Sequence, residues 1–343
     1  MSEPELLEYH KVRPQTSRRR AGGPIFRHVL ACVDMSPFSR AALAHAAAIA
    51  LAADARLTVM HVVEPSAGQA PTDPVEWRLS HRDVEAKLRE RVSHLGDLHP
   101  DAVVIDGPAA ERICAWARDN DVDLTVMGAG GDDNSPFAGL GNTSRRVAES
   151  TDASVLVVPP MEVGDEPVHY SRVMTPLDGS CRSECALPIA LGIAAVHEAE
   201  FLLVHAAPNI DLTETGPLEA EAIALRDRLR HRNERVAEQY LKKVRARLPS
   251  AGVSMRMRVL ASGDPRHALA RSVVDEKSDI IVLSSTGLSG HPDLSLGSVA
   301  EYLINHADKP ILLVRGPDGN APRARLLGED ALPVRLPSRA LML

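Results

Sequence analysis

The sequence predicts an α/β protein in which one unit, a mostly parallel sheet with helices on both faces, occurs twice. Two observations carry this prediction. Short apolar segments alternate with segments of helical spacing, a pattern typical of right-handed βαβ connections and a parallel sheet covered on both sides. The same motifs also recur at constant offsets in the two halves of the 343 residues. A chain of this length has room for two domains of about 100–200 residues each.

The first unit begins with an apolar strand over residues 25–33, which ends at Asp34. Ser36 and Pro37 follow, and both residue types favour the start of a helix. Strands and helices then alternate to the end of the unit. In order, we expect a helix over 41–53, a strand over 57–63, a helix over 75–95, a strand over 102–105, a helix over 110–120, a strand over 124–127, a short helix from Thr143 and a last strand over 154–158.

The second unit repeats this order after a linker. Its first strand ends at Asp178, and a helix that starts at Ser180 contains Pro188, which is expected to kink it. The polar ends of the chain are expected to be tails. The predicted layout is a tail at 1–24, a first unit at 25–158, a linker at 159–171, a second unit at 172–315 and a C-terminal tail at 316–343.

Two offsets relate equivalent motifs of the two units. The offset is 144 residues from Asp34 to Asp178 and from His61 to His205, and it is 156 residues from Gly107 to Gly263 and from Gly141 to Gly297. The second unit therefore carries twelve additional residues, the difference of the two offsets, within a charged helical stretch at 219–248. A solvated amphipathic face and a surface for a protein partner are both compatible with that stretch.

Composition excludes several classes of function. Hydrophobic residues make up 44% and charged residues 25%, so the chain can form a core. Aromatic residues are only 3%, and the net charge is −7. Base stacking needs aromatic side chains, and binding to a phosphate backbone needs positive charge, so nucleic acid is not an expected partner.

Cysteine content and hydropathy point to a cytoplasmic protein. Four cysteines in a chain of this length do not form a disulfide framework. Cys181 and Cys185 are four residues apart on a predicted helix; ordinary thiols are the simpler interpretation, and a metal or redox pair is the alternative. No leader-like segment and no run of 18 apolar residues occurs, so no membrane association is expected.

A glycine-rich loop follows the fourth strand of each unit. The first runs from Gly128-Ala129-Gly130-Gly131 to Gly141-Asn142, and the second from Ser284-Ser285-Thr286-Gly287 to Gly297-Ser298, each with nine residues between. Glycines allow close backbone approach, and a helix that opens after the loop presents free N–H groups to an anion. A Walker A loop is absent, and a dinucleotide fingerprint fails because Asp133 stands where a glycine is needed.

These loops, the aspartate after the first strand and the histidine in the second make both halves resemble universal stress protein domains. That family is marked by Gly, two residues, Gly, nine residues, Gly and then Ser or Thr. The resemblance implies two flavodoxin/Rossmann-like (adenine nucleotide alpha hydrolase-like) domains, each with a five-stranded parallel sheet. It also implies ATP or a related adenine nucleotide as ligand, alone or with Mg²⁺, with adenine near the first-strand aspartate and phosphates on the glycine loop.

Carried over residue by residue, the resemblance gives one candidate pocket in each unit. The first would use Asp34, Val62, Met127, Gly128, Gly131, Gly141, Asn142 and Thr143. The second would use Asp178, Ala206, Leu283, Gly287, Gly297, Ser298 and Val299. No metal ligands are assigned in either pocket.

Each pocket departs from the family pattern. In the first, Asn142 replaces Ser or Thr, and the pair Asp132-Asp133 brings negative charge into a phosphate loop; Arg145 and Arg146 are candidates to offset that charge. In the second, Ser284 replaces the first glycine, which is costly if that position needs a positive φ. On balance we expect the second pocket to bind phosphate better.

Three classes of function remain open. The first is a cytoplasmic stress-response regulator that binds adenine nucleotide at the glycine loops without strong catalysis. The second is a scaffold of the same fold that has lost nucleotide and acts through a protein partner. The third is an enzyme, which the sequence favours least because no metal–carboxylate set with a positioned nucleophile can be assembled; slow ATP hydrolysis stays open.

The final strands of the two units predict how the units associate. An apolar edge strand favours pairing, and in the resembled family the last strand commonly pairs about a two-fold axis. With two units in one chain, strands 154–158 and 310–314 can pair with each other and form an intramolecular pseudo-dimer. Pairing between chains, which gives a homodimer, is the alternative. His61 and His205 are interpreted as structural, each with one satisfied ring nitrogen.

Overall fold

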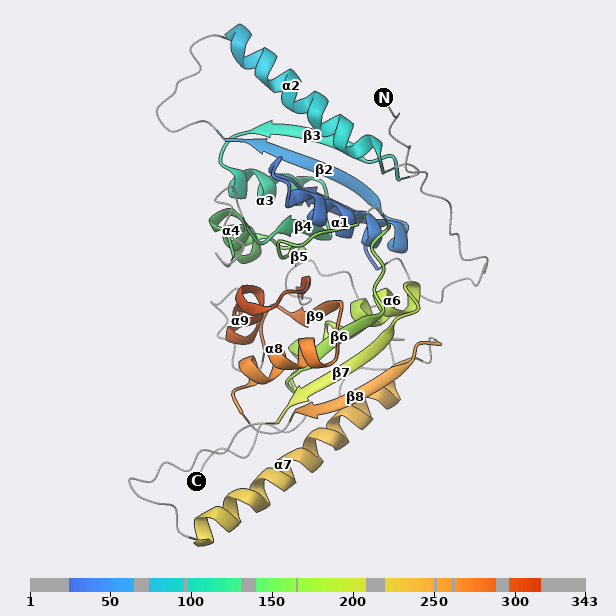
Figure 1. The fold of residues 1–343 in the computed structure, drawn as a ribbon, viewed down its shortest axis with the longest axis vertical. Coiled ribbons are helices and arrows are strands. Elements are labelled where there is room, and N and C mark those ends of the chain that lie inside the picture. The colour runs from blue at the N-terminus through green and yellow to red at the C-terminus, as the bar shows by residue number, and fades with distance from the viewer. Residues whose placement is uncertain are drawn as a thin grey trace.

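The computed structural model describes residues 25–64, 74–95, 98–130, 140–164, 166–207, 220–249, 252–260, 263–287 and 296–315. Both units have the predicted order of strands and helices (Figure 1). The first unit contains β1 (His28–Cys32), α1 (Ser39–Ala53), β2 (Arg56–Val63), α2 (Pro74–Ser93), β3 (Asp101–Asp106), α3 (Ala109–Asp119), β4 (Leu124–Gly128), α4 (Asn142–Ser150) and β5 (Ser154–Val158). The second contains β6 (Arg172–Leu177), α5 (Cys181–Glu184), α6 (Leu187–Val196), β7 (Glu200–Ala206), α7 (Ala220–Arg247), β8 (Met255–Leu260), α8 (Pro265–Asp275), β9 (Ile280–Ser284), α9 (Ser298–His306) and β10 (Ile311–Val314). Both predicted tails lie outside the described residues.

All ten strands form one sheet in the order β3-β2-β1-β4-β5-β10-β9-β6-β7-β8. Pairing is parallel within each unit, which confirms the predicted fold class. Alternate strand residues face opposite layers: Val29 and Ala31 pack in one apolar cluster and Leu30 in the other. Helices α1, α2, α6 and α7 contribute to the first cluster, and α3, α4, α8 and α9 to the second. Each cluster contains residues of both units, so the molecule has a core shared by the two repeats.

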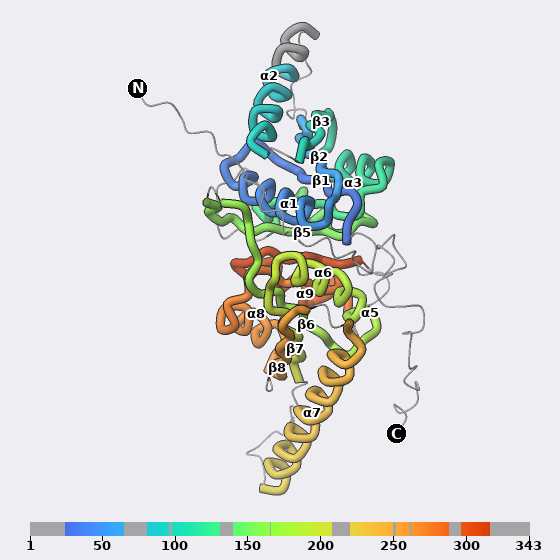
Figure 2. Tube along the Cα trace, turned by 90° about the vertical axis from the view of Figure 1, so that its right-hand side faces the viewer, coloured from blue at the N-terminus to red at the C-terminus, as the bar shows by residue number. Residues whose placement is uncertain are grey.

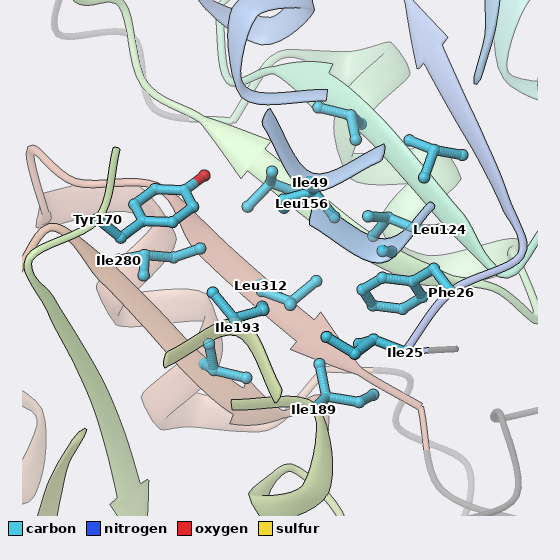
Figure 3. Packing of buried hydrophobic residues seen from close by; sticks show 14 of the residues in the cluster. Ile25, Phe26, Ile49, Leu124, Leu156, Tyr170, Ile189, Ile193, Ile280 and Leu312 are labelled. Atoms are coloured by element: carbon cyan, nitrogen blue, oxygen red, sulfur yellow. The ribbon is translucent and has the colours of Figure 1, made fainter. Parts of the chain in front are cut away.

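The units join through their last strands, as the pseudo-dimer prediction requires. β5 and β10 pair antiparallel, and Leu156 lies opposite Leu312. These two leucines are 156 positions apart, which is the offset of the glycine loops. Equivalent residues of the two units therefore face each other, which is the arrangement that a local two-fold axis through this strand pair produces. Figure 3 shows the two leucines within the buried cluster between the units.

Helices and the linker fill the space beside this strand pair. Phe26 and Ile193 are buried there, and Figure 3 shows them with Ile25 around Leu312. A Cβ placed on Gly192 would lie 2.7 Å from Cδ1 of Ile25, so α6 approaches the first unit as closely as a glycine permits. Tyr170, in the predicted linker, is 1% exposed and its hydroxyl lies 2.8 Å from Nδ1 of His45 in α1. The linker is thus part of the interface.

The helix predicted from Ser180 is divided into two. α5 ends at Glu184 and α6 begins at Leu187, with Pro188 in its first turn. Proline has no N–H for a bond to the preceding turn, so the chain breaks before it rather than bending through it. Ser180 caps α5, because its hydroxyl oxygen accepts a hydrogen bond from the backbone N–H of Ser183 at 3.1 Å.

Candidate functional site

The candidate residues gather at the carboxyl ends of neighbouring strands. In the first unit β1 lies between β2 and β4, and α1 and α4 leave these strands toward opposite layers. Such a topological switch point opens a crevice outside the strand ends. Asp34 follows β1, Val62 is in β2, and Met127 and Gly128 end β4. The second unit repeats the arrangement with β6 between β7 and β9.

In the second unit the aspartate and the glycine loop are in direct proximity. A Cβ on Gly287 would lie 2.3 Å from Oδ2 of Asp178, so no side chain fits between them. A Cβ on Gly297 would lie 3.5 Å from the carbonyl oxygen of Ser285, an ordinary contact. Two predicted site residues that are 109 positions apart in sequence are therefore brought together, and a side chain at 287 would displace the Asp178 carboxylate from its present position.

Both aspartates close the same turn after their strand. The Oδ1 atom of Asp34 accepts a hydrogen bond from the backbone N–H of Ser36 at 3.0 Å, and Oδ1 of Asp178 accepts one from that of Ser180 at 2.9 Å. The residue between is left-handed in both units: Met35 has φ 62° and Gly179 has φ 86°.

The two histidines hold the neighbouring strand. Nδ1 of His61 lies 2.7 Å from the carbonyl oxygen of Val33, and Nδ1 of His205 lies 2.8 Å from that of Leu177. Because the carbonyl can only accept, Nδ1 carries the proton in each ring. Burial lowers the pKa of His205, with the Leu177 carbonyl and Asp178 acting in the opposite direction. Each ring has the one satisfied nitrogen predicted for a structural histidine.

Each glycine loop is closed by a backbone hydrogen bond at its base. The N–H of Gly141 donates to the carbonyl of Ala129 at 2.6 Å, and the N–H of Gly297 donates to that of Ser285 at 2.7 Å. Between these anchors, Gly131 and the pair Asp132-Asp133 lie outside the described residues, as do residues 288–295. The anchors fix where α4 and α9 begin relative to the strand ends.

The helices after the loops have uncapped first turns. Gly141 and Gly297 are the N-cap residues of α4 and α9 and offer no side chain. Within the described part of the chain, no hydrogen bond reaches the backbone N–H groups of residues 142–144 or 298–300. The starts of α8 and α3 differ: Asp264 accepts from the backbone N–H of Arg266 at 2.9 Å, and Glu64 accepts from that of Ala109 at 2.6 Å. Free N–H groups at α4 and α9 are suited to an anion.

The condition under which Ser284 would be costly is not met. Ser284 ends β9 and is not among the residues with positive φ, and its hydroxyl donates to the carbonyl of Thr286 at 2.8 Å, so serine there is unstrained. Gly128, at the equivalent position, also lacks a positive φ. Among the described residues, Arg145 pairs with Glu301 at 3.0 Å and Arg146 pairs with Glu111, while the Asp132-Asp133 pair lies outside them.

Sequence reasoning missed the residues that clamp the turns from the long helices. Arg91 in α2 donates to the carbonyl of Met35 at 2.7 Å and to the Ser39 hydroxyl at 2.7 Å. Arg247 in α7, which is 156 positions further on, pairs with Glu184 at 2.9 Å. The constant offset was the signal that could have found this pair.

In the second unit Tyr240 of α7 also contacts Glu184, the partner of Arg247. Its hydroxyl donates to Glu184 at 3.0 Å, and its ring lies 5.6 Å from that of His205. Burial raises the pKa of the Tyr240 phenol well above its usual range, and Glu184 acts in the same direction. The phenol therefore stays protonated and donates to the carboxylate.

The described residues contain no group of three or more His, Cys, Asp or Glu side chains that could hold a metal ion. Cys181 is exposed, while burial raises the pKa of the Cys185 thiol to about 11. A thiol of that pKa is protonated at neutral pH and a poor nucleophile. None of the helices in the described segments is both long and apolar enough to span a bilayer.

The fold is that of a tandem α/β protein with two equivalent topological switch points. A model of the universal stress protein family matches residues 25–159 and 169–315. A universal stress protein of Mycobacterium tuberculosis is 24% identical over 297 residues, covering 84% of this chain and 96% of that protein. One of Methanocaldococcus jannaschii is 30% identical over 151 residues, covering 43% of this chain and 84% of the relative.

A solved structure shows the same fold along most of the chain. The crystal structure of a universal stress protein from Archaeoglobus fulgidus covers 87% of this chain and 100% of its own length, with a TM-score of 0.61 at 16% identity. This chain belongs to the universal stress protein family, as a member with two domains in tandem.

Proposed function

We propose that this tandem universal stress protein is a cytoplasmic stress-response regulator that binds ATP or a related adenine nucleotide at its strand-end crevices and acts through binding rather than strong catalysis. The observation that carries the proposal is the pair of uncapped first turns at α4 and α9, each behind a closed glycine loop. Oriented backbone N–H groups can hold phosphate oxygens without a basic side chain. Mg²⁺ would arrive with the nucleotide rather than on protein ligands.

The candidate adenine contacts are apolar in both units. Met127 and Leu283 are buried at the ends of β4 and β9, and Val62 and Ala206 are half-buried in β2 and β7. Aliphatic side chains with backbone donors and acceptors suit a planar base in a chain with few aromatic residues. The aspartate turn would meet the nucleoside, and the glycine loop the phosphates.

The second crevice is the stronger candidate for tight binding. It has Ser298 where the family has Ser or Thr and lacks the Asp132-Asp133 pair of the first loop. The absence of strain at Ser284 removes the one argument against it.

Titration calorimetry of the full chain with ATP and Mg²⁺ tests the proposal. Asp34→Ala and Asp178→Ala are a matched pair, because the two residues form the same turn in the two units. We expect Asp178→Ala to weaken the tight site at least about tenfold, as for the loss of one hydrogen bond to a charged group. Asp34→Ala should leave that site unchanged. Absence of binding to the wild type at millimolar nucleotide rejects the proposal, and a phosphate-release assay on the same samples tests slow hydrolysis.

A scaffold without nucleotide is the second candidate, favoured by the two aspartates in the first loop. It predicts that a variant with Asp132→Gly, Asp133→Gly and Ser284→Gly gains ATP binding that the wild type lacks. Because Ser284 is unstrained, any gain should come from the two aspartates alone. Equal binding by wild type and variant contradicts the scaffold.

A further inference from the structure

Helix α7 extends well beyond the body of the second unit. Its buried residues are Ala237, Leu241 and Val244, all in the C-terminal half, which packs against β7 and β8. No residue over 220–236 is buried. Figures 1 and 2 show this half projecting past β8, away from the sheet, in both views. About four turns of helix thus have no partner among the described residues.

The charge of α7 is opposite to that of the chain. The helix carries nine Arg or Lys and four Asp or Glu, a net of +5. The whole chain has a net charge of −7, so the remainder carries −12. Within the projecting half, residues 222–236 carry five Arg and two Asp or Glu, a net of +3, which favours binding to anionic surfaces.

Apolar residues form a seam along the projecting half. Ala222, Leu225, Leu229 and Val236 recur at the a and d spacing of a heptad. Leu225 is 45% exposed and Val236 is 52% exposed, both high for aliphatic side chains on a helix. A seam of this kind is buried when a second helix packs along it, and isolated surface leucines would not share one line.

Arginines lie on both sides of the seam, and one arginine interrupts its apolar residues. Arg226, Arg228 and Arg235 occupy the e and g positions, and Arg232 occupies a d position. Among the residues that the structure describes, none of the four has a carboxylate partner, whereas Arg230 lies 3.8 Å from Glu234 and Lys242 lies 3.6 Å from Glu238. The seam arginines are therefore available to carboxylates from outside the chain.

We propose that residues 222–236 of α7 dock an acidic amphipathic helix of another protein, with its apolar face on the seam and its Glu or Asp side chains on the flanking arginines. A second copy of α7 is a poor occupant, because e and g arginines would face arginines in either orientation. A bilayer is disfavoured because α7 has neither Trp nor Phe, and its one aromatic residue, Tyr240, is bound to Glu184. A nucleic acid would meet the acidic remainder of the molecule.

Fluorescence anisotropy with the full chain tests the proposal. The probe is a labelled peptide of about three heptads with leucine in the seam and glutamate at the flanking positions. The control probe has lysine in place of glutamate. We expect the glutamate peptide to bind, more weakly as salt rises, and the lysine peptide not to bind.

Charge reversal localises the binding. Arg228→Glu with Arg235→Glu should weaken the glutamate peptide at least about tenfold, as two attractive contacts become repulsive, and should create binding of the lysine peptide. The matched control is Arg112→Glu with Arg271→Glu, which makes the same charge change at exposed positions of α3 and α8 and should leave both probes unaffected.

Four results would overturn the proposal. They are no binding of the glutamate peptide, equal binding after reversal on α7, tighter binding to phosphatidylglycerol vesicles or duplex DNA than to the peptide, and self-association of the chain that reversal abolishes. Circular dichroism of each variant separates loss of docking from loss of fold. The inference is independent of ATP binding, so either can fail while the other stands.

Discussion

At the scale of single residues, the second crevice depends on the contact between one carboxylate and one glycine. Asp178 could be predicted from its place after the first strand, and Gly287 from the loop pattern. Their proximity could not, because it depends on how the turn after β6 folds back toward β9. The unstrained backbone at Ser284 could not be predicted either, because a glycine in the family pattern does not reveal the φ angle at that position.

Glycine-to-alanine substitutions should separate the two kinds of glycine in these loops. Gly287→Ala places a methyl group 2.3 Å from Oδ2 of Asp178, so the carboxylate must move and its bonds to Ser180 must loosen. We expect a loss of about 1–3 kcal/mol in the free energy of unfolding, measured by urea titration. Gly128→Ala is the control: its methyl would lie 3.7 Å from the nearest carbonyl oxygen, and stability should not fall. Equal losses would contradict this account.

Two buried histidines at the interface give the protein a stability that depends on pH. Burial lowers the pKa of His45 and of His197 to about 4. Nδ1 of His197 accepts a bond from the Tyr170 N–H at 3.4 Å, which a protonated ring could not do. Between pH 6.5 and 4 the unfolded chain takes up protons that the folded chain does not, so stability falls as the pH drops through this window.

Each histidine should contribute up to about 3 kcal/mol of this loss, because burial holds its pKa at about 4. Urea titrations at several values of pH measure it. His45→Gln keeps a partner for the Tyr170 hydroxyl and does not titrate, so the difference between wild type and variant isolates the share of His45. An unchanged slope in the variant would refute the assignment.

At the scale of elements, periodicity predicted the strands and helices well because buried strands and amphipathic helices have different repeats. The division of the helix at Pro188 and the projection of α7 were not predicted. The division of the helix depends on which residue loses its backbone hydrogen bond. The projection of α7 depends on where the sheet ends beneath the helix. Nor could the ion pair between Arg145 of α4 and Glu301 of α9 be derived, because it joins helices from opposite units.

The pair Arg145–Glu301 offers a test of how α4 and α9 meet. The side chains are 39% and 50% exposed, so the pair should contribute only about 0.2–1 kcal/mol. Arg145→Glu should destabilise the protein, because two glutamates then face each other. The exchange Arg145→Glu with Glu301→Arg should restore most of the loss in a double-mutant cycle. No recovery in the exchanged variant would show that the pair does not couple the helices.

At the scale of the molecule, the two repeats share both apolar clusters and should unfold together. The two-domain organisation followed from the constant offsets in sequence, whereas the common core follows from the pairing of β5 with β10. Both tryptophans, Trp77 and Trp116, belong to the first unit. Tryptophan fluorescence therefore reports on one unit, and circular dichroism reports on both.

A substitution in the second unit should shift the fluorescence of the first. Leu203 in β7 is fully buried, and Leu203→Ala should cost about 2–5 kcal/mol. We expect the urea midpoints by fluorescence and by circular dichroism to coincide in the wild type and to fall together in the variant. A fluorescence midpoint that stays in place would indicate independent units.

The register of β5 and β10 also determines which substitutions the interface between the two units can accept. In an assembly of two identical subunits, a residue at the two-fold axis always meets its own copy, so a charge there repels itself and only neutral residues are tolerated. Fusion of the two copies into one polypeptide removes that restriction, because each half mutates alone. Leu156 and Leu312 retain the symmetric solution, while Arg145 and Glu301 are equivalent positions that have taken opposite charges. A gene encoding only one half would lose that complementarity, since each of its copies would set like charge against like.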